Sequence, residues 1–349
     1  MKRCTKCIFH ENIPGISFND EGICNYCEEY VPFKELGEEK LLELIDSVRE
    51  HDGEYNCIVP MSGGRDSTYV LYMAKAVYGL NPLAVNFDNE FANPQAVKNI
   101  ENACEVLSVD LRVVRSKRDI ATKFVKSNVR AGIPMGMRTL AGSFCRQCAY
   151  GYKGVVYIEA EKEHVPLILW GASSAESTKD MRELMVESKA RSRYWKLINP
   201  HLYLTEIRAL QQRMEFAVPG NPLFSRSTPV LMNKQIREVS VFDYVKWDRE
   251  LIKDTIMNKL GWRKPEGHIS SWRSDCVLHE IVNYCYVKLL GCTMDCIGYC
   301  NMIRSGQMTR EVALAQEEEA VATCGNKIDI QLAEHLGLTK QEIESIKAL

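Results

Sequence analysis

The sequence predicts an α/β protein built on a doubly wound parallel sheet, with a small cysteine-rich unit before the sheet and a helical region after it. Strand-like apolar runs alternate with amphipathic helical segments between residues 56 and 170. Paired cysteines crowd the first residues, and helical periodicity prevails beyond about residue 275. We therefore divide the 349 residues into segments 1–30, 31–265 and 266–349.

Composition and charge exclude several classes of function. Hydrophobic residues make up 46% of the chain and the formal net charge is −2, so no overall charge draws it toward nucleic acid or an anionic membrane. No apolar run reaches the length of a membrane-spanning helix, and the start Met1-Lys2-Arg3-Cys4 has no hydrophobic signal core. We expect a cytoplasmic protein with no membrane partner.

The N-terminal segment 1–30 carries two Cys-x2-Cys pairs. Cys4 and Cys7 form the first pair, and Cys24 and Cys27 form the second, with 16 residues between the pairs. In a reducing compartment, cysteines clustered in this way are metal ligands more often than disulfides. Two such pairs can hold one Zn²⁺ through four thiolates, so this segment is predicted to be a zinc ribbon. A reactive dithiol is the alternative.

The elements of the sheet follow in order along the chain. Residues 31–54 predict a polar helical connector with one apolar face. The pattern then predicts strands at 56–61, 83–87, 111–114 and 166–170, helices at 67–77, 94–107 and 120–129, a strand-like run at 237–244 and a helix at 248–260. In such sheets, ligands bind at the carboxyl ends of the strands. The basic segment 175–235 is either a lid over an anionic substrate or an irregular surface.

One turn in this series predicts a pyrophosphate site. The strand at 56–61 runs directly into Ser62-Gly63-Gly64-Arg65-Asp66-Ser67 and then into a helix. Glycines allow a sharp turn and a close approach of the backbone to an anion, and a helix start offers unpaired N–H groups. The turn lacks the Gly-Lys-Ser/Thr ending of a Walker loop. It resembles the PP-loop of ATP pyrophosphatases, in the adenine nucleotide α-hydrolase-like (HUP) group of folds.

This resemblance implies that ATP is cleaved between its α- and β-phosphates and that a substrate oxygen is adenylated. Mg²⁺ would offset the charge of the leaving pyrophosphate. Asp66 would act in catalysis by supporting the loop or positioning the metal. The residues expected to bind the nucleotide are Ser62, Gly63, Gly64, Arg65, Asp66, Ser67, Asn86, Asp88 and Gly171. Asp88 is otherwise an acid that merely ends a strand.

Two further cysteine groups carry alternative interpretations. Cys145 and Cys148 precede a helix that is expected to start near residue 149, where the helix N-terminus would lower a thiol pKa. They are candidates for a catalytic nucleophile or for metal ligands. Cys292, Cys296 and Cys300 repeat at a spacing of four and would share one helical face. Together the five cysteines could hold an iron–sulfur cluster; buried, chemically inert cysteines are the alternative.

Several segments together resemble bacterial N-acetyl sugar amidotransferases. These segments are 4–27, 55–69, 78–83, 165–171 and 305–311. The resemblance implies an enzyme of surface-polysaccharide (lipopolysaccharide) biosynthesis that converts the acetamido group of a nucleotide-linked sugar into an acetamidino group. ATP would activate the amide oxygen as an adenylate, and ammonia would displace AMP. A separate glutaminase partner would supply the ammonia. A homodimer is one candidate assembly, and the sequence does not determine the oligomeric state.

The chain departs from this family pattern where the acceptor should bind. Gly171 is followed by Ala172-Ser173 instead of Glu-Asn, and Cys145 and the 292–300 cysteines are additional. Paired cysteines beside such a loop also resemble iron–sulfur-dependent tRNA thiolation enzymes, which is the main alternative. Only in that case would nucleic acid be a partner, through a local basic patch. The patch consists of Arg112, Arg115, Lys117, Arg118, Lys123, Lys126 and Arg130. A nonenzymatic zinc-ribbon adaptor that senses ATP is a third hypothesis.

Overall fold

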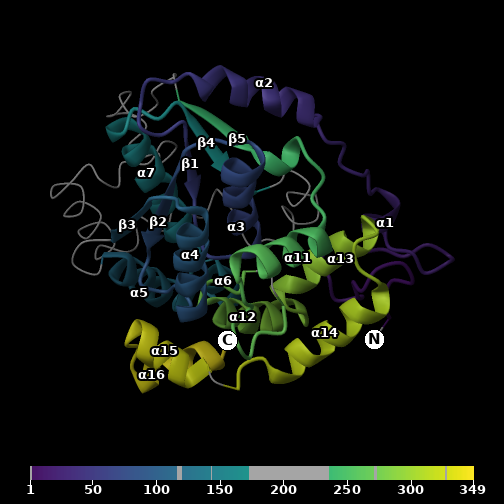
Figure 1. The fold of residues 1–349 in the computed structure, drawn as a ribbon. Coiled ribbons are helices and arrows are strands. Elements are labelled where there is room, and N and C mark those ends of the chain that lie inside the picture. Colours follow the sequence, from purple (N-terminus) through teal and green to yellow (C-terminus); the bar gives the residue numbers. More distant parts are fainter. Residues whose placement is uncertain (1, 116–119, 143, 173–235, 271–272, 327) are drawn as a thin grey trace, which may run out of the picture.

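A parallel sheet organises the chain (Figure 1). The computed structural model describes residues 2–115, 120–142, 144–172, 236–270, 273–326 and 328–349. In these residues the sheet has five strands in the spatial order β3-β2-β1-β4-β5, and every neighbouring pair is parallel. The strands are β1 (Cys57–Pro60), β2 (Pro82–Asp88), β3 (Leu111–Arg115), β4 (Leu167–Trp170) and β5 (Arg237–Ser240). The predicted doubly wound parallel sheet is confirmed.

Helices cover both faces of the sheet. One face packs against α2 (Glu38–Arg49), α3 (Arg65–Tyr72), α4 (Pro94–Leu107) and α11 (Arg249–Leu260), and the other against α7 (Arg146–Lys162). Along β1, Cys57 and Val59 are buried in the first layer and Ile58 in the second. Because both faces of a parallel sheet are buried, its strands read as continuous apolar runs. This is why the strands could be located in the sequence.

Several element boundaries differ from those predicted. Helix α4 matches its predicted range, and it begins at an N-cap where the Asn93 side chain accepts from the backbone N–H of Gln95. The helix after β1 starts two residues earlier than predicted and continues from α3 into a π-helical turn, η1 (Met73–Val77). Strand β5 ends at Ser240 instead of 244, because a 3₁₀ turn, η6 (Val241–Asp243), follows it.

The C-terminal region is helical, as predicted, and it packs against the N-terminal cysteine segment. The helices are α12 (His279–Leu290), α13 (Met294–Arg304), α14 (Arg310–Thr323), α15 (Ile328–Leu336) and α16 (Lys340–Lys347). Their core also contains Phe9 and residues of the short helix α1 (Asn25–Glu28). It further includes α5 (Ile120–Gly132) and α6 (Met137–Ala141), and the 3₁₀ turn η3 (Ile133–Met135) connects these two helices. In Figure 1 the N-terminal segment lies beside α13 and α14. The predicted division at 30/31 and 265/266 stays a prediction.

Two sequence interpretations concern the membrane and the basic segment. Within the described residues, no helix combines the length and the apolar character needed to cross a membrane. The segment 175–235, interpreted as a lid or an irregular surface, lies outside the described residues.

Candidate functional site

The loop at 62–67 occupies the topological switch point of the sheet. It follows β1, whose neighbours β2 and β4 lie on opposite sides, and ligands of open α/β sheets bind in the crevice at such a point. Gly63 has φ +79°, and a Cβ there would lie 2.1 Å from the backbone oxygen of Ala96. A Cβ on Gly171, at the end of β4, would lie 2.9 Å from the backbone nitrogen of Ser67. Both positions therefore need glycine, as the predicted sharp turn requires.

The two serine hydroxyls of the loop face each other. Ser62 Oγ and Ser67 Oγ are 3.3 Å apart, and the Gly64 N–H donates to Ser62 Oγ at 3.2 Å. Ser67 Oγ donates to the Gly64 carbonyl at 3.2 Å, which holds the hydroxyl at the N-terminus of α3. Hydroxyls and N–H groups gathered at a helix N-terminus form a favourable environment for phosphate oxygens.

Arg65 and Asp66 turn away from these hydroxyls toward Trp247. Arg65 is buried, and its Nε lies 3.0 Å from Asp66 Oδ1. The indole N–H of Trp247 also donates to Asp66 Oδ1 at 3.0 Å, and the Arg65 guanidinium lies 4.9 Å from the Trp247 ring centroid. These contacts favour loop support among the two roles predicted for Asp66. A direct contact of Arg65 with the nucleotide stays a prediction.

Side chains from distant segments hold the back of the loop. The indole N–H of Trp262 donates to the Gly63 carbonyl at 3.0 Å, and Asn99 Nδ2 donates to the same oxygen at 3.3 Å. Asn99 also bonds both backbone groups of Arg263, which ties α4 to the segment after α11. Sequence reasoning missed these residues, because nothing near Trp262 or Asn99 in the chain indicates that they lie against the loop.

Asp275 is a second residue that the sequence did not assign to this site. Its carboxylate Oδ2 lies 3.5 Å from the position a Cβ on Gly64 would occupy. An antiparallel bridge between Ala92 and Cys276 holds its segment near the end of β2, and the Asn93 N–H donates to the Asp275 carbonyl at 2.8 Å. The C-terminal region therefore adds a carboxylate to the crevice. Carboxylate oxygens are the ligands that Mg²⁺ prefers.

Cys145 lies close enough to Asp275 for the two groups to interact electrostatically. It is the N-cap of α7, which begins at Arg146, so the helix starts earlier than predicted and includes Cys148 in its first turn. The Cys145 thiol reaches solvent, yet desolvation by the surrounding protein raises its pKa, with Asp275 adding to the rise and Arg273 opposing it. This net direction is opposite to the lowering expected from the helix N-terminus. The side chain of Cys148 lies outside the described side chains.

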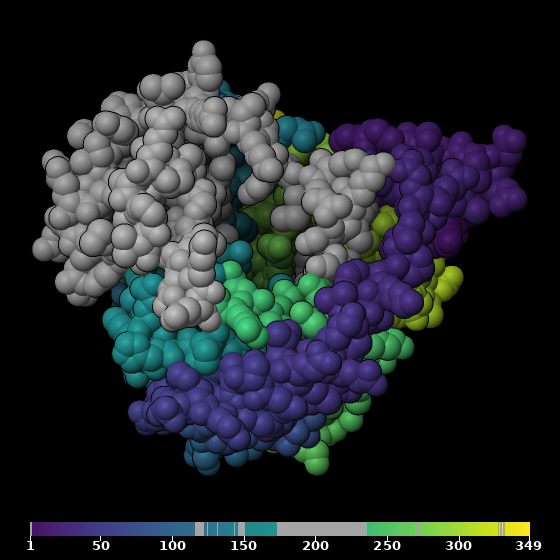
Figure 2. Space-filling view, turned by 90° about the horizontal axis from the view of Figure 1, so that it is seen from above, coloured from purple at the N-terminus to yellow at the C-terminus, as the bar shows by residue number. Residues whose placement is uncertain are grey.

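In the space-filling view, green atoms of the chain beyond residue 236 lie beside teal atoms of the chain before residue 172 (Figure 2). Arg273 and Asp275, from the later segment, act electrostatically on Cys145, from the earlier one.

Asn86 and Asp88 lie on β2, as predicted, and each has a partner within the protein. Asn86 Nδ2 donates to the Met61 carbonyl at 2.7 Å, which ties β2 to the start of the loop. Asp88 Oδ2 lies 2.9 Å from Arg115 Nε, and Asp88 Oδ1 accepts from the N–H of Glu90. For Asp88 these contacts support the alternative of an acid that ends a strand. The predicted nucleotide contacts of both residues stay predictions.

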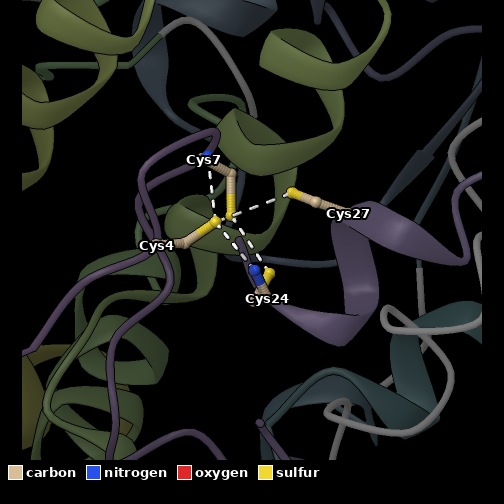
Figure 3. A group of neighbouring side chains, drawn as sticks. All are labelled: Cys4, Cys7, Cys24 and Cys27. Atoms are coloured by element: carbon tan, nitrogen blue, oxygen red, sulfur yellow. Dashed lines mark hydrogen bonds between the residues drawn. The ribbon is translucent and has the colours of Figure 1, made fainter. Parts of the chain in front are cut away.

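The four N-terminal cysteines converge as a metal site would require (Figure 3). All four are buried, and the sulfurs are 3.9 Å apart in the pair Cys4–Cys27 and 3.7 Å apart in the pair Cys7–Cys24. A tetrahedral site with Zn–S bonds of about 2.3 Å has sulfurs about 3.8 Å apart. The four residues therefore fit Zn²⁺, and they form a cysteine cluster of the kind found in a zinc ribbon.

Hydrogen bonds prepare this cluster for a cation. Backbone N–H groups of Lys6, Cys7 and Cys24 point at Cys4 Sγ at 3.4, 3.4 and 3.2 Å. Side-chain hydrogen bonds from Cys24, Cys27 and Cys7 hold the pKa of the Cys4 thiol below its ordinary value, so a thiolate is favoured there. The Arg310 guanidinium, at the start of α14, donates to the carbonyls of Cys4 and Cys7.

The remaining cysteines do not all gather at one place. Cys292 and Cys296 converge with Glu317 in the C-terminal core, and Cys300 interacts with Cys296 and with Cys7 of the N-terminal site. Among the described side chains, Cys145 joins neither group of potential ligands. Because the Cys148 side chain is not described, the five-cysteine cluster stays a prediction.

Three of the seven residues in the predicted basic patch pair with acidic side chains. Arg112 pairs with Glu159 and Glu163, and Arg115 pairs with Asp88. Arg130 pairs with Glu342, and Lys126 donates to the Gly337 carbonyl. Lys117 and Arg118 lie outside the described residues. Paired guanidinium groups release fewer counterions on binding phosphate, so this surface is a weak candidate for nucleic acid.

Comparisons with known proteins give a sequence relative and several distant structural likenesses, of which two are described below. No family model matches the chain. It is 28% identical over 151 residues to an uncharacterized protein of Methanocaldococcus jannaschii, MJ1599; the match covers 42% of this chain and 50% of that protein. The chain thus spans about half the length of the curated relative that it matches.

The two structural likenesses are loose. One is to the U34-tRNA thiolase NcsA from Methanococcus maripaludis with its [4Fe-4S] cluster, at 11% identity and a TM-score of 0.35, over 100% of this chain and 89% of that one. The other is to the NMN synthetase from Francisella tularensis, at 12% identity and a TM-score of 0.39, over 86% and 94%. At such TM-scores the function must be argued from the loop and its surroundings.

Proposed function

We propose that the protein is an ATP-dependent adenylating enzyme that transfers nitrogen from ammonia to an amide carbon. The observation that carries this proposal is the loop at 62–67, whose two hydroxyls and helix N-terminus meet at the switch point of the sheet. Its turn at Gly63 leaves no room for a side chain. Such a loop suits the pyrophosphate part of ATP.

The chemistry follows from the stability of amides. An amide oxygen is a poor leaving group, so it first attacks the α-phosphorus of ATP while pyrophosphate departs into the loop. Ammonia then adds to the activated carbon, AMP leaves with the former amide oxygen, and loss of protons from nitrogen gives the amidine. In this scheme the Ser62 and Ser67 hydroxyls and the Gly64 N–H stabilise the charge on the departing pyrophosphate.

Asp275 is the residue we assign to Mg²⁺. Its carboxylate Oδ2 and the Ser62 hydroxyl both lie near the Cβ position of Gly64, at 3.5 and 3.1 Å. A magnesium ion there would neutralise charge on the leaving group. Asp66 instead supports the loop through its bonds with Arg65 and Trp247.

The acceptor we propose is the acetamido group of a nucleotide-linked sugar, with ammonia supplied by a separate glutaminase. The support for this choice is the resemblance of the segments 4–27, 55–69, 165–171 and 305–311 to N-acetyl sugar amidotransferases. Sulfur transfer to tRNA is less well supported, because Arg112, Arg115 and Arg130 of the basic patch pair with acidic side chains. The raised pKa of Cys145 also disfavours a standing thiolate beside the loop.

Label transfer tests the proposal. The full-length protein is incubated with ATP, Mg²⁺, ammonium chloride and a set of UDP-linked N-acetyl sugars that carry heavy oxygen in the acetamido carbonyl. We expect an amidine product, with the heavy oxygen recovered in AMP by mass spectrometry. Asp275→Asn should slow AMP formation at least tenfold, and extra Mg²⁺ should partly restore the rate.

Three results would contradict this proposal or redirect it. Formation of ADP with inorganic phosphate would rule out adenylation, because ATP would then be cleaved between its β- and γ-phosphates. AMP without heavy oxygen would mean that the amide oxygen is not the attacking group. AMP formation that needs tRNA and a sulfur donor, but no sugar, would establish the sulfur transferase in place of the amidotransferase.

A further inference from the structure

A second group of metal-ligand side chains lies in the C-terminal core, away from the 62–67 loop. Its members are Cys292, just before α13, Cys296 in the first turn of α13, and Glu317 on α14. The two sulfurs and a carboxylate oxygen all lie within 4.8 Å of one another. Each residue is at most 1% exposed. Three ligand-type groups from two helices thus meet in a space closed to solvent.

Hydrogen bonds fix the carboxylate in this position. The backbone N–H of Thr293 donates to Glu317 Oε1 at 2.7 Å, and the Thr293 hydroxyl donates to Oε2 at 2.6 Å. Thr293 is also the N-cap of α13 and accepts from the Cys296 N–H at 3.3 Å. Because each carboxylate oxygen has a further lone pair, these bonds orient Glu317 without using its full capacity as a ligand.

The Glu317 carboxylate has neutral hydrogen-bond partners. Among the described residues these partners are the backbone N–H and the hydroxyl of Thr293. Asp295, on the same helix as Cys296, is bonded to His279 at 2.8 Å. Burying a carboxylate is costly, and hydrogen bonds such as those from Thr293 are one way to offset that cost.

A bound metal ion is the other solution, and we propose that Cys292, Cys296 and Glu317 hold a second zinc ion. Two thiolates and a carboxylate are ligands that Zn²⁺ accepts, whereas Mg²⁺ and Ca²⁺ prefer oxygen alone. The fourth position is open to water or to Cys300, which interacts with Cys296 on one side and with Cys7 of the N-terminal site on the other. The second ion would pin the start of α13 to the middle of α14.

Metal analysis of the full-length protein tests this site. Protein purified under reducing conditions without chelators is expected to contain two zinc ions per chain by plasma mass spectrometry. Cys292→Ser and Glu317→Gln should each lower the content to about one. Cys57→Ser is the matched control, because Cys57 is equally buried but lies in the sheet core, and its zinc content should stay at two.

X-ray absorption of the wild-type protein keeps the test decisive if a variant fails to fold. Two sites of the proposed kinds should give an average sulfur coordination per zinc below that of a pure tetrathiolate, with an added oxygen shell. A wild-type chain with one zinc in all-sulfur coordination, or Glu317→Gln with undiminished zinc, would overturn the proposal. Either result would leave Glu317 with a structural role as the hydrogen-bond acceptor of Thr293. Labile sulfide in place of zinc would overturn it as well.

Discussion

Gly63 determines the shape of the nucleotide loop at the level of a single residue. Its positive φ and its close approach to Ala96 leave no room for a Cβ. Trp262 and Asn99 then hold its carbonyl from behind, so the loop is fixed from both sides. A rigid loop binds phosphate without a further entropy cost for ordering the backbone.

Gly63→Ala should therefore abolish ATP binding, measured by titration calorimetry. Backbone strain at this φ costs about 1–3 kcal/mol, and relief of the clash with Ala96 would displace the loop. Gly37→Ala is the matched control, since Gly37 also has a positive φ (+101°) but nothing within 4 Å of its Cβ position. That control should lose some stability and keep its affinity for ATP. Equal affinity in Gly63→Ala would show that the turn is not part of the site.

Sequence reasoning could assign to the candidate site only those residues whose place in the loop depends on their immediate neighbours in the chain. Gly63, Gly64, Ser62 and Ser67 were found because strand, glycines, hydroxyls and helix are contiguous. Asp275 and the loop supports Trp247, Trp262 and Asn99 were not found, because they reach the loop only through tertiary packing. The same limit applies to Cys145: the helix start was recognised, but Asp275, which adds to the rise of the thiol pKa, lies far along the chain.

At the level of elements, one acidic side chain of α16 both caps that helix and links it to α5. Thr339 and Glu342 form a capping box at the start of α16, and Glu342 also pairs with Arg130 of α5. Burial alone would raise the pKa of Glu342, but hydrogen bonds from Arg130 and Thr339 lower it to about 2. A carboxyl whose pKa falls on folding stabilises the folded state only while it is ionised.

The stabilisation of the folded state by ionised Glu342 should be present above about pH 4.5 and should disappear as the pH falls toward 2. Because Arg130 is 48% exposed, solvent screening limits the contribution of the Arg130–Glu342 pair to the free energy of unfolding to about 1 kcal/mol. Glu342→Gln should be less stable than wild type by that amount at pH 7, and the difference should vanish near pH 2, as measured by chemical denaturation. Glu344→Gln, at a 70% exposed position of the same helix, is the control. A difference that persists unchanged to pH 2 would refute the assignment.

Element type proved easier to predict than element boundaries. The strands were located because their runs are buried on both faces, and α4 was bounded correctly because Asn93-Pro94 is a strong helix start. The start of α7 was placed too late. Residues 145–148 carry no comparable start signal, since Cys145 offers no side-chain cap. The end of β5 depends on the 3₁₀ turn that follows, which has no distinctive sequence pattern.

At the scale of the whole molecule, the two ends of the chain build one core around the metal-ligand cysteines. The N-terminal cysteines, Phe9 and helices α12 to α16 share this core, and Arg310 bonds the carbonyls of Cys4 and Cys7. The same C-terminal region sends Asp275 to the nucleotide loop. Sequence spacing predicted the four-cysteine site, but it carried no information about which distant helices would enclose it.

This arrangement makes the C-terminal region part of the proposed active site as well as a support for the metal site. The sheet supplies the phosphate-binding turn, and the later segment supplies the carboxylate that faces Gly64. The central claim is therefore that the pyrophosphate part of ATP binds between the Ser62 and Ser67 hydroxyls, opposite Asp275.

A crystal structure of the full-length protein with Mg²⁺ and an ATP analogue that carries a methylene bridge between the α- and β-phosphates tests this claim most directly. We predict that the β- and γ-phosphates accept hydrogen bonds from Ser62, the Gly64 N–H and Ser67, with Mg²⁺ between them and Asp275. Phosphates bound elsewhere on the chain, with the 62–67 loop unliganded at saturating analogue, would contradict the account.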